Sequence, residues 1–283
     1  MGKSGEIDYL TKGGPDFIRH AKHKPFSDIN CAGYLMEFGG LMALLPPPPA
    51  RVLDLGCGTG WTSRFLAKTG YETVAIDISP EMIFHAEEMR QQDKLDNLSF
   101  VVADYEDLQF LEEFDAVVFY DSLHHAVDEE LALRKAYQAL RPGGVCLASE
   151  PGEGHSLSEA AVRAVERFDV TEKDMPPRYI MEIGRRCGFR DLASAPPANL
   201  NRAFDLSPPP VARAKIKWRK KIRRALWPLP HEHRKPLKWL AHLLLLRSMD
   251  LTSEQFEELW RFSKHLRELS DVAARKGLTR MVK

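Results

Sequence analysis

Three glycines at alternate positions, Gly56, Gly58 and Gly60, follow a short apolar segment at Val52–Leu55. Because glycine has no side chain, such a turn lets backbone N–H groups come close to a ligand, and a helix that follows it presents its N-terminus to the same place. About twenty residues later, a second apolar segment ends at Asp77, where a carboxylate can accept hydrogen bonds from both hydroxyls of a ribose. These residues predict a site for a nucleotide-type cofactor.

Three histidines, His124, His125 and His155, lie in the segments after the fourth and fifth expected strands. Histidine has a pKa near neutrality and can act as the general base that a weakly acidic hydroxyl needs. Asp121 and Glu150 lie in the same segments and could orient a histidine or hold a substrate hydroxyl. Helix capping and packing are the alternatives for the first two histidines. His155, between a glycine and a serine, is slightly favoured as the base.

The chain from residue 51 alternates apolar strand-like runs with amphipathic stretches, a pattern typical of a parallel sheet covered by helices. We expect an α/β fold with a Rossmann-like, doubly wound sheet of seven strands. Ligands of such sheets bind at the carboxyl ends of the strands, where the residues above would meet. The strands are expected at residues 52–55, 73–76, 98–102, 115–120, 145–149, 189–195 and 277–283, and the helices at 29–45, 62–68, 79–92, 128–140, 157–168 and 179–187.

Four segments are expected. Residues 1–50 would form an arm with one short helix and a cap helix, which either packs on the core or covers the cofactor. The core would span 51–204, a helical insertion 205–275, and the final core strand 276–283.

The stretch 213–238 is strongly basic, and Glu232 is its only acid. On a helix its apolar residues share one face, so one interpretation is a lid helix with a solvated basic side. The other is contact with an anionic carrier, an acidic polysaccharide or the inner surface of a membrane. Nucleic acid is disfavoured, because no RNA-binding module accompanies the helix. The helices that follow could shape an acceptor pocket or a homodimer contact.

Composition narrows the class of protein. Lys+Arg 40 and Asp+Glu 40 cancel, and the four cysteines form no CxxC pair, which indicates a reducing setting. The longest apolar run, Trp239–Leu246, is too short to cross a bilayer. We therefore expect a soluble, cytoplasmic protein. We also expect no bound metal, because Asp121, Asp128 and Glu129 supply a carboxylate cluster only loosely.

Residues 51–150 resemble the class I S-adenosylmethionine-dependent methyltransferases, because five motifs fall in the right order at the strand ends. The motifs are Asp54–Gly60, Asp77–Met82, Ala103–Tyr105, Phe119–His125 and Leu140–Gly144. A dinucleotide-binding fingerprint would instead have a small residue where this chain has Trp61. The resemblance implies S-adenosylmethionine as the cofactor.

The resemblance also implies roles near the methionine and ribose moieties. The three glycines would let the backbone approach the methionine, and Asp54 would organise the turn or reach the amino group indirectly. Asp77 would bind the ribose hydroxyls, with helix capping as the alternative. Tyr120 and Asp121 would stand near the transferable methyl group.

At the adenine the resemblance implies four contacts. Ile78 and Met82 would lie against the ring. Asp104 would accept a hydrogen bond from the amino group, with Tyr105 beside it. For Met82 and Tyr105 the alternative is ordinary core packing.

A narrower resemblance, over most of residues 24–195, is to bacterial methyltransferases of surface-polysaccharide and glycan clusters. It rests on residues 60–63, 119–125, 150–156 and 170–177. It implies O-methylation of a hydroxyl on a sugar or a glycan or lipid-linked precursor. The alternatives are O- or N-methylation of a small metabolite and a non-catalytic cofactor-binding interaction subunit. The chain lacks the Asn/Asp-Pro-Pro-Tyr motif of many nucleobase and glutamine N-methyltransferases, which makes those substrates less expected.

Overall fold

A seven-stranded sheet forms the centre of the protein in a computed structural model that describes residues 3–195 and 276–283. Its strand order is β3-β2-β1-β4-β5-β7-β6. Neighbouring strands from β3 to β5 run parallel, and β7 runs antiparallel to β5 and β6. The strands are β1 (Arg51–Leu55), β2 (Glu72–Asp77), β3 (Leu98–Val102), β4 (Phe114–Tyr120), β5 (Leu140–Pro151), β6 (Arg190–Ala195) and β7 (Lys276–Val282). The predicted seven-stranded sheet is confirmed, and the last predicted strand lies within it.

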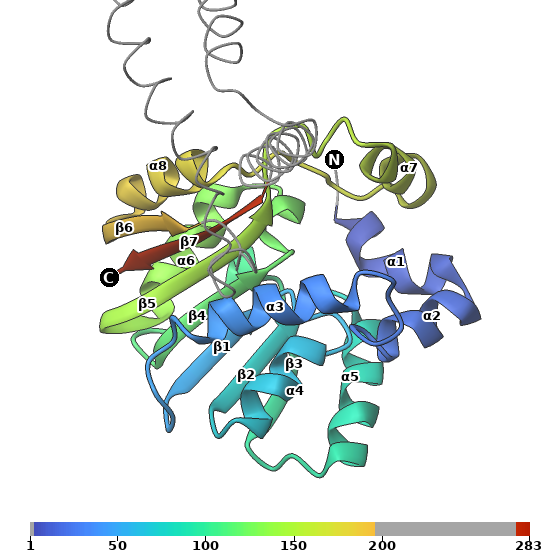
Figure 1. Cartoon of the computed structure of the whole chain (residues 1–283), viewed down its shortest axis with the longest axis horizontal. Helices are drawn as coiled ribbons and strands as arrows, with labels where there is room; N and C mark the ends of the chain where they lie inside the picture. Colours follow the sequence, from blue (N-terminus) through green and yellow to red (C-terminus); the bar gives the residue numbers. More distant parts are fainter. Residues whose placement is uncertain (1–2, 196–275) are drawn as a thin grey trace, which may run out of the picture. The chain divides into compact units, whose positions relative to one another are not determined.

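Helices cover both faces of the sheet (Figure 1). On one face lie α3 (Cys31–Met42), α4 (Trp61–Lys68) and α5 (Pro80–Asp93), and on the other α6 (Glu129–Ala139) and α8 (Pro177–Cys187). Within β4, Ala116 and Val118 pack in the same cluster as Phe38 of α3, whereas Val117 and Phe119 pack with α6 and α8. Because successive strand residues point to opposite faces, a strand covered on both sides is apolar throughout, as predicted for β4.

Local signals set most element boundaries. Pro80 begins α5, and the Ser79 hydroxyl caps it by accepting a hydrogen bond from the Met82 N–H at 3.4 Å. The predicted bounds of the helices agree with the structure within three residues. Strand β5 is longer than predicted: Leu140 pairs with Phe114 after a register shift, so the Arg-Pro-Gly-Gly segment expected to close α6 becomes part of the strand.

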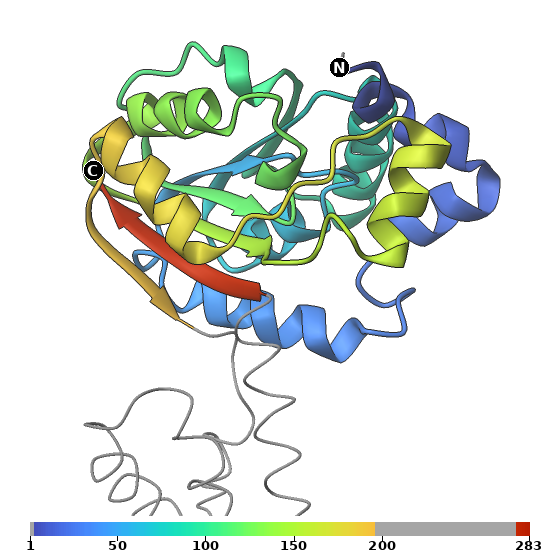
Figure 2. The same ribbon diagram turned by 90° about the horizontal axis from the view of Figure 1, so that it is seen from above.

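The N-terminal arm contains two helices, α1 (Ser4–Gly13) and α2 (Pro15–Lys22), so the prediction of one short helix there was wrong. Gly14, with φ of 82°, interrupts the helix, and Pro15 at the first position of α2 starts a new one. Both helices lie with α7 (Glu159–Phe168) at the end of the sheet toward which the parallel strands point (Figure 2). The arm is therefore at the carboxyl ends of the strands.

Helix α8 packs very closely on β7. A Cβ added at Gly184 would lie 2.4 Å from Sδ of the fully buried Met281. We expect Gly184→Ala to lower the free energy of unfolding by about 1–3 kcal/mol, because the overpacked helix or sheet must shift. Gly39→Ala in α3 is the matched control: nothing lies within 4 Å of its added Cβ, so it should be neutral or stabilising. Urea unfolding of the two variants checks this, and equal stabilisation by both would contradict it.

The predicted insertion at 205–275, with the basic stretch 213–238, lies outside the described residues. The proposed segment boundaries there stay predictions. Among the described helices, none is both long enough and apolar enough to cross a membrane.

Candidate active site

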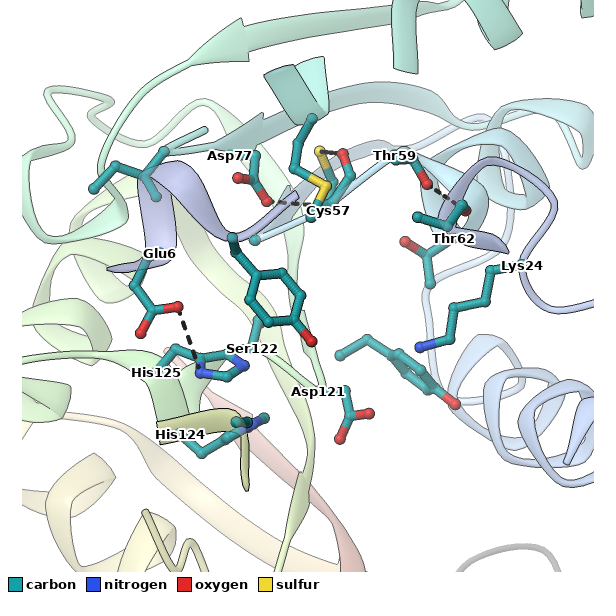
Figure 3. Close-up of a pocket in the computed structure, with 18 of the residues that line it drawn as sticks. Glu6, Lys24, Cys57, Thr59, Thr62, Asp77, Asp121, Ser122, His124 and His125 are labelled. Atoms are coloured by element: carbon teal, nitrogen blue, oxygen red, sulfur yellow. Dashed lines mark hydrogen bonds and ion pairs between the residues drawn. The ribbon is translucent and has the colours of Figure 1, made fainter. Parts of the chain in front are cut away.

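A cavity of about 510 Å³ lies at the carboxyl ends of the strands. The turn after β1, the end of β2, the loop after β4 and the N-terminal arm all contribute to its lining. Figure 3 shows Asp77 and Cys57 at the opposite end of the view from His124 and His125. The cavity thus brings the predicted cofactor residues and the predicted catalytic residues together.

The three glycines of the turn have left-handed backbones, with φ of 74°, 55° and 79° at Gly56, Gly58 and Gly60. A Cβ at the first would lie 2.6 Å from Cβ of Ser122, and one at the third 2.5 Å from Cζ of Phe100. At Gly58 the nearest atom is the Met82 sulfur, 4.0 Å away. Of the three glycines, only Gly58 has open space where a side chain would lie, and the backbone from Gly56 to Thr59 lines the cavity, where a ligand can approach it. Gly60 does not line the cavity, and packing accounts for its lack of a side chain.

Asp54 lies beneath the turn and is 1% exposed. Its carboxylate accepts hydrogen bonds from the hydroxyls of Thr62, at 2.7 Å, and Ser63, at 2.6 Å. Burial raises the pKa of Asp54, and the two hydroxyls partly oppose that effect. Asp54 does not line the cavity, and it fixes the start of α4, which agrees with the predicted role of organising the turn.

Asp77 ends β2 and lines the cavity. One carboxylate oxygen accepts a hydrogen bond from the Gly58 N–H at 2.8 Å, and the other accepts one from the Ser79 N–H at 2.9 Å. A carboxylate has about four acceptor positions, so two remain for the ribose hydroxyls. The open backbone at Gly58 and the acceptors of Asp77 both fit the predicted cofactor.

The pKa of the Asp77 carboxyl is raised to about 6, first by burial and also by the charge of Asp54, against the two backbone N–H donors. A protonated carboxyl cannot accept hydrogen bonds from two hydroxyls equally well. Cofactor affinity should therefore fall, by up to about tenfold per pH unit, as pH drops below about 6. Glu6, whose burial raises its pKa to about 7, faces the same cavity. Calorimetric titration of cofactor into the Asp77→Asn variant distinguishes the effect of Asp77 from that of Glu6. This variant should bind the cofactor more weakly, and its affinity should lose most of the dependence on acid pH.

At the predicted adenine end, Ile78 and Met82 line the cavity. Asp104 accepts a hydrogen bond from the Glu106 N–H at 2.9 Å and forms an ion pair with Lys3 from the arm. Lys3 also pairs with the Glu106 carboxylate at 2.8 Å. The carboxylate assigned to the adenine amino group is therefore held by the arm in this structure.

Tyr105 and Tyr120 both line the cavity and also pack. The Tyr105 hydroxyl donates to the Ser122 carbonyl at 3.0 Å. The ring of Tyr120 lies edge-on to Trp61 and to Phe38, with centroids 5.4 Å apart in each pair. Packing, the alternative given for Tyr105, therefore describes its position, and Tyr120 packs as well; both still line the cavity and can contact a ligand.

Asp121 follows β4 with a left-handed backbone, φ of 57°, which is uncommon outside glycine. Its N–H donates to the Ser149 carbonyl at 2.8 Å, so the neighbouring strand holds this conformation. Its side chain lines the cavity. Figure 3 shows it near Ser122 and His124, which follow it in the loop after β4. A strained backbone conformation that neighbouring hydrogen bonds maintain is found more often at functional sites than elsewhere.

Glu150 is completely buried and does not line the cavity. Its carboxylate accepts backbone hydrogen bonds from Ser122, Leu123 and His124, and it pairs with His124 Nδ1 at 2.7 Å. It therefore anchors the short helix η2 (Leu123–His125) and orients His124. Burial opposes protonation of His124, but the hydrogen bond and charge of Glu150 outweigh it and raise its pKa. Of the predicted roles of Glu150, the orienting one fits its position.

His125 and His155 are each held through one ring nitrogen. His125 Nδ1 lies 2.6 Å from the Thr171 carbonyl, and His155 Nε2 lies 2.6 Å from the Glu172 carboxylate. Burial, together with the nearby His124, lowers the pKa of His125 to about 4, so its ring is neutral at pH 7. In each ring the other nitrogen can accept a proton or a ligand.

The sequence analysis did not single out Glu172, which is a central residue of this cluster. Its carboxylate pairs with His155 and lies 3.5 Å from His124 Nε2. The only signal for Glu172 in the sequence is its place in the segment 170–177, one of the four on which the narrower resemblance rests. Glu6 was also missed: it accepts the Thr171 N–H at 2.7 Å and lies 3.7 Å from His125 Nδ1.

The arm forms one wall of the cavity. The Ala21 carbonyl accepts a hydrogen bond from Thr59 of the glycine turn at 2.6 Å, and Lys22 pairs with Glu88 of α5 at 2.9 Å. The Tyr9 ring contacts Phe168 of α7, with centroids 4.7 Å apart. These contacts belong to α1 and α2, whereas the predicted cap helix, α3, packs on the core through Phe38 and Leu41. That the arm covers the cofactor stays a prediction.

Known proteins similar in sequence to this chain are methyltransferases, which agrees with the predicted cofactor site. Residues 52–144 match the family model of a methyltransferase domain. The chain is 30% identical over 148 residues to sarcosine/dimethylglycine N-methyltransferase of Halorhodospira halochloris, covering 51% of this chain and 53% of that protein. It is 36% identical over 108 residues to ubiquinone biosynthesis O-methyltransferase of Xanthomonas axonopodis pv. citri, covering 36% of this chain and 43% of that protein.

The fold also matches a solved structure. Phosphoethanolamine N-methyltransferase 2 of Haemonchus contortus, in complex with S-adenosyl-L-methionine, superposes with a TM-score of 0.58 at 20% identity, covering 100% of this chain and 59% of that one. The chain spans about half or less of the curated relatives it matches. Residues 52–144 thus match a methyltransferase domain, and the sheet with its flanking helices has the fold of a methyltransferase solved with S-adenosyl-L-methionine.

Proposed function

We propose that the protein transfers a methyl group from S-adenosylmethionine to a hydroxyl of a small acceptor. The observation that carries this proposal is that one cavity is lined both by the turn with Asp77 and by the His155–Glu172 pair. S-adenosylmethionine supplies an activated methyl group on a sulfonium. The protein then has to align the acceptor and take up its proton.

His155 is the general base in this proposal. Its Nε2–H donates to Glu172, which leaves Nδ1 as the proton acceptor, and the carboxylate stabilises the imidazolium that forms. His124 fits the role less well, because the pairing with Glu150 already raises its pKa. His125 is a weak base, because its pKa is lowered to about 4. Asp121, in the same cavity, is placed to hold the acceptor hydroxyl.

We also propose a sugar or a glycan or lipid-linked precursor as the acceptor class. Support comes from the narrower resemblance, two of whose four segments, 150–156 and 170–177, are joined by hydrogen bonds beside the cavity. The Asp174 carboxylate accepts the N–H groups of Gly154, at 2.8 Å, and Ser156, at 2.7 Å. An anionic carrier bound through residues 213–238 stays a prediction.

Transfer of a labelled methyl group by the full chain tests the proposal. The acceptor panel would contain neutral sugars, phenols, and amines such as sarcosine. We expect hydroxyl acceptors to be labelled. Labelling of amines alone would favour the second candidate, a small-metabolite N-methyltransferase, which the relative named for sarcosine supports. Cofactor binding without transfer to any acceptor would favour a non-catalytic interaction subunit.

A further inference from the structure

We propose that His124, His125 and Glu172 bind one divalent transition-metal ion, of the zinc, iron or manganese class, in the wall of the cavity. One ligand atom from each residue lies within 4.8 Å of the other two. Ligand atoms around such an ion, bound at about 2.0–2.2 Å, are about 3.3 Å apart in tetrahedral geometry. Small side-chain rotations would bring the three onto one ion.

Both histidines are held in the way that metal-binding histidines usually are. His124 Nδ1 faces the Glu150 carboxylate at 2.7 Å, and His125 Nδ1 faces the Thr171 carbonyl at 2.6 Å. Histidine ligands almost always donate their second ring N–H to a carboxylate or a carbonyl, which fixes the ring and leaves the other nitrogen for the ion. In both rings the nitrogen left for an ion is Nε2.

The charges around the cluster favour a cation. In the described part of the chain, every ion pair of Glu150 and Glu172 is with a histidine. Glu6 and Asp121 line the same cavity. The 3.5 Å between His124 Nε2 and the Glu172 carboxylate is too long for a good hydrogen bond. A divalent ion would join these two groups and balance the negative charge of Glu150 and Glu172.

The ligand set indicates the class of ion. Two imidazoles and one carboxylate suit zinc, iron and manganese, whereas magnesium and calcium prefer oxygen ligands. No metal was expected from the sequence, because the cysteines form no CxxC pair and Asp121, Asp128 and Glu129 form only a loose carboxylate cluster. Three protein ligands leave a coordination position open. That position would hold the acceptor oxygen and make its proton easier to remove, a role that rests on the proposed function.

The test uses the full chain after removal of metals with a chelator, without cofactor or acceptor. Cobalt(II), whose visible spectrum reports its ligands, is the probe, and zinc competes with it. We expect one ion per chain and a spectrum typical of nitrogen and oxygen ligands. His125→Ala and Glu172→Gln should each weaken binding at least about a hundredfold. Saturating magnesium should not displace the cobalt.

His20→Ala is the matched control, because His20 lines the same cavity outside the cluster. This variant should bind cobalt as the unchanged protein does. No binding by the unchanged protein, displacement by magnesium, or equal binding by His125→Ala and Glu172→Gln with their native circular dichroism would overturn the proposal. Because these measurements involve no methyl transfer, failure of the proposed function would leave their result unaffected.

Discussion

Asp77→Ala is expected to weaken S-adenosylmethionine binding at least about a hundredfold. The carboxylate has two acceptor positions left for the ribose hydroxyls after its bonds to Gly58 and Ser79. Hydrogen bonds to a charged group contribute about 1.5–3 kcal/mol each, so the loss of two is large. Removal of the carboxylate also frees the Gly58 N–H, which loosens the turn. Calorimetric titration of cofactor into the full chain measures the effect.

The exposed Asp96 provides the control, since Asp96→Ala removes a carboxylate outside the cavity. Its affinity for the cofactor should be that of the unchanged protein. If Asp77→Ala binds the cofactor equally well, the assignment of the ribose site is wrong. A melting curve recorded for each variant separates lost binding from lost folding.

His155→Ala is expected to lower the rate of methyl transfer to an alcohol by about 10²–10⁴-fold, the usual contribution of a positioned general base. Cofactor affinity should stay unchanged. The predicted cofactor contact Asp77 lies at the end of the view away from His124 in Figure 3, and the His155 ring is 5.2 Å from the His124 ring, centroid to centroid. The loss should shrink for a phenol, which gives up its proton more readily than an alcohol. Single-turnover measurements with labelled cofactor check both parts.

His23→Ala serves as the control here, because His23 is exposed and does not line the cavity, and this variant should keep full activity with both acceptors. A loss that is equal for alcohol and phenol would point to a positioning role for His155 instead. Unchanged rates would mean that alignment alone suffices for the reaction.

The strands and the cofactor turn were predictable because their signals are local. Leu98–Val102 was predicted with the bounds it has, and the cap at Ser79 follows from a serine before a proline. Asp77 was placed correctly because it ends a strand beside the glycine turn. Each of these conclusions depends on neighbours within a few residues along the chain.

Glu172 could not be found in this way. It reaches His155 because its segment is fastened from outside, by the Glu6 carboxylate at Thr171 and by Asp174 at the backbone of Gly154. Neither Glu6 nor Gly154 is near Glu172 in sequence. The break at Gly14 is set locally, by its positive φ and by Pro15. That both halves of the arm are helical was not predicted, and α1 packs there on α5 and α7, which are distant in sequence.

The position of β7 has a consequence for biosynthesis. This strand emerges from the ribosome last of the seven, yet it fills the gap between β5 and β6, pairing Val145 with Val282 and Pro151 with Lys276. Until then the nascent chain carries an unpaired edge along β5, and β6 lacks the neighbour that it pairs with. Such distant pairing is slow, so the edge of β5 stays open until β7 has been synthesised and has paired, and this open edge is where a nascent chain would be captured by chaperones or aggregate.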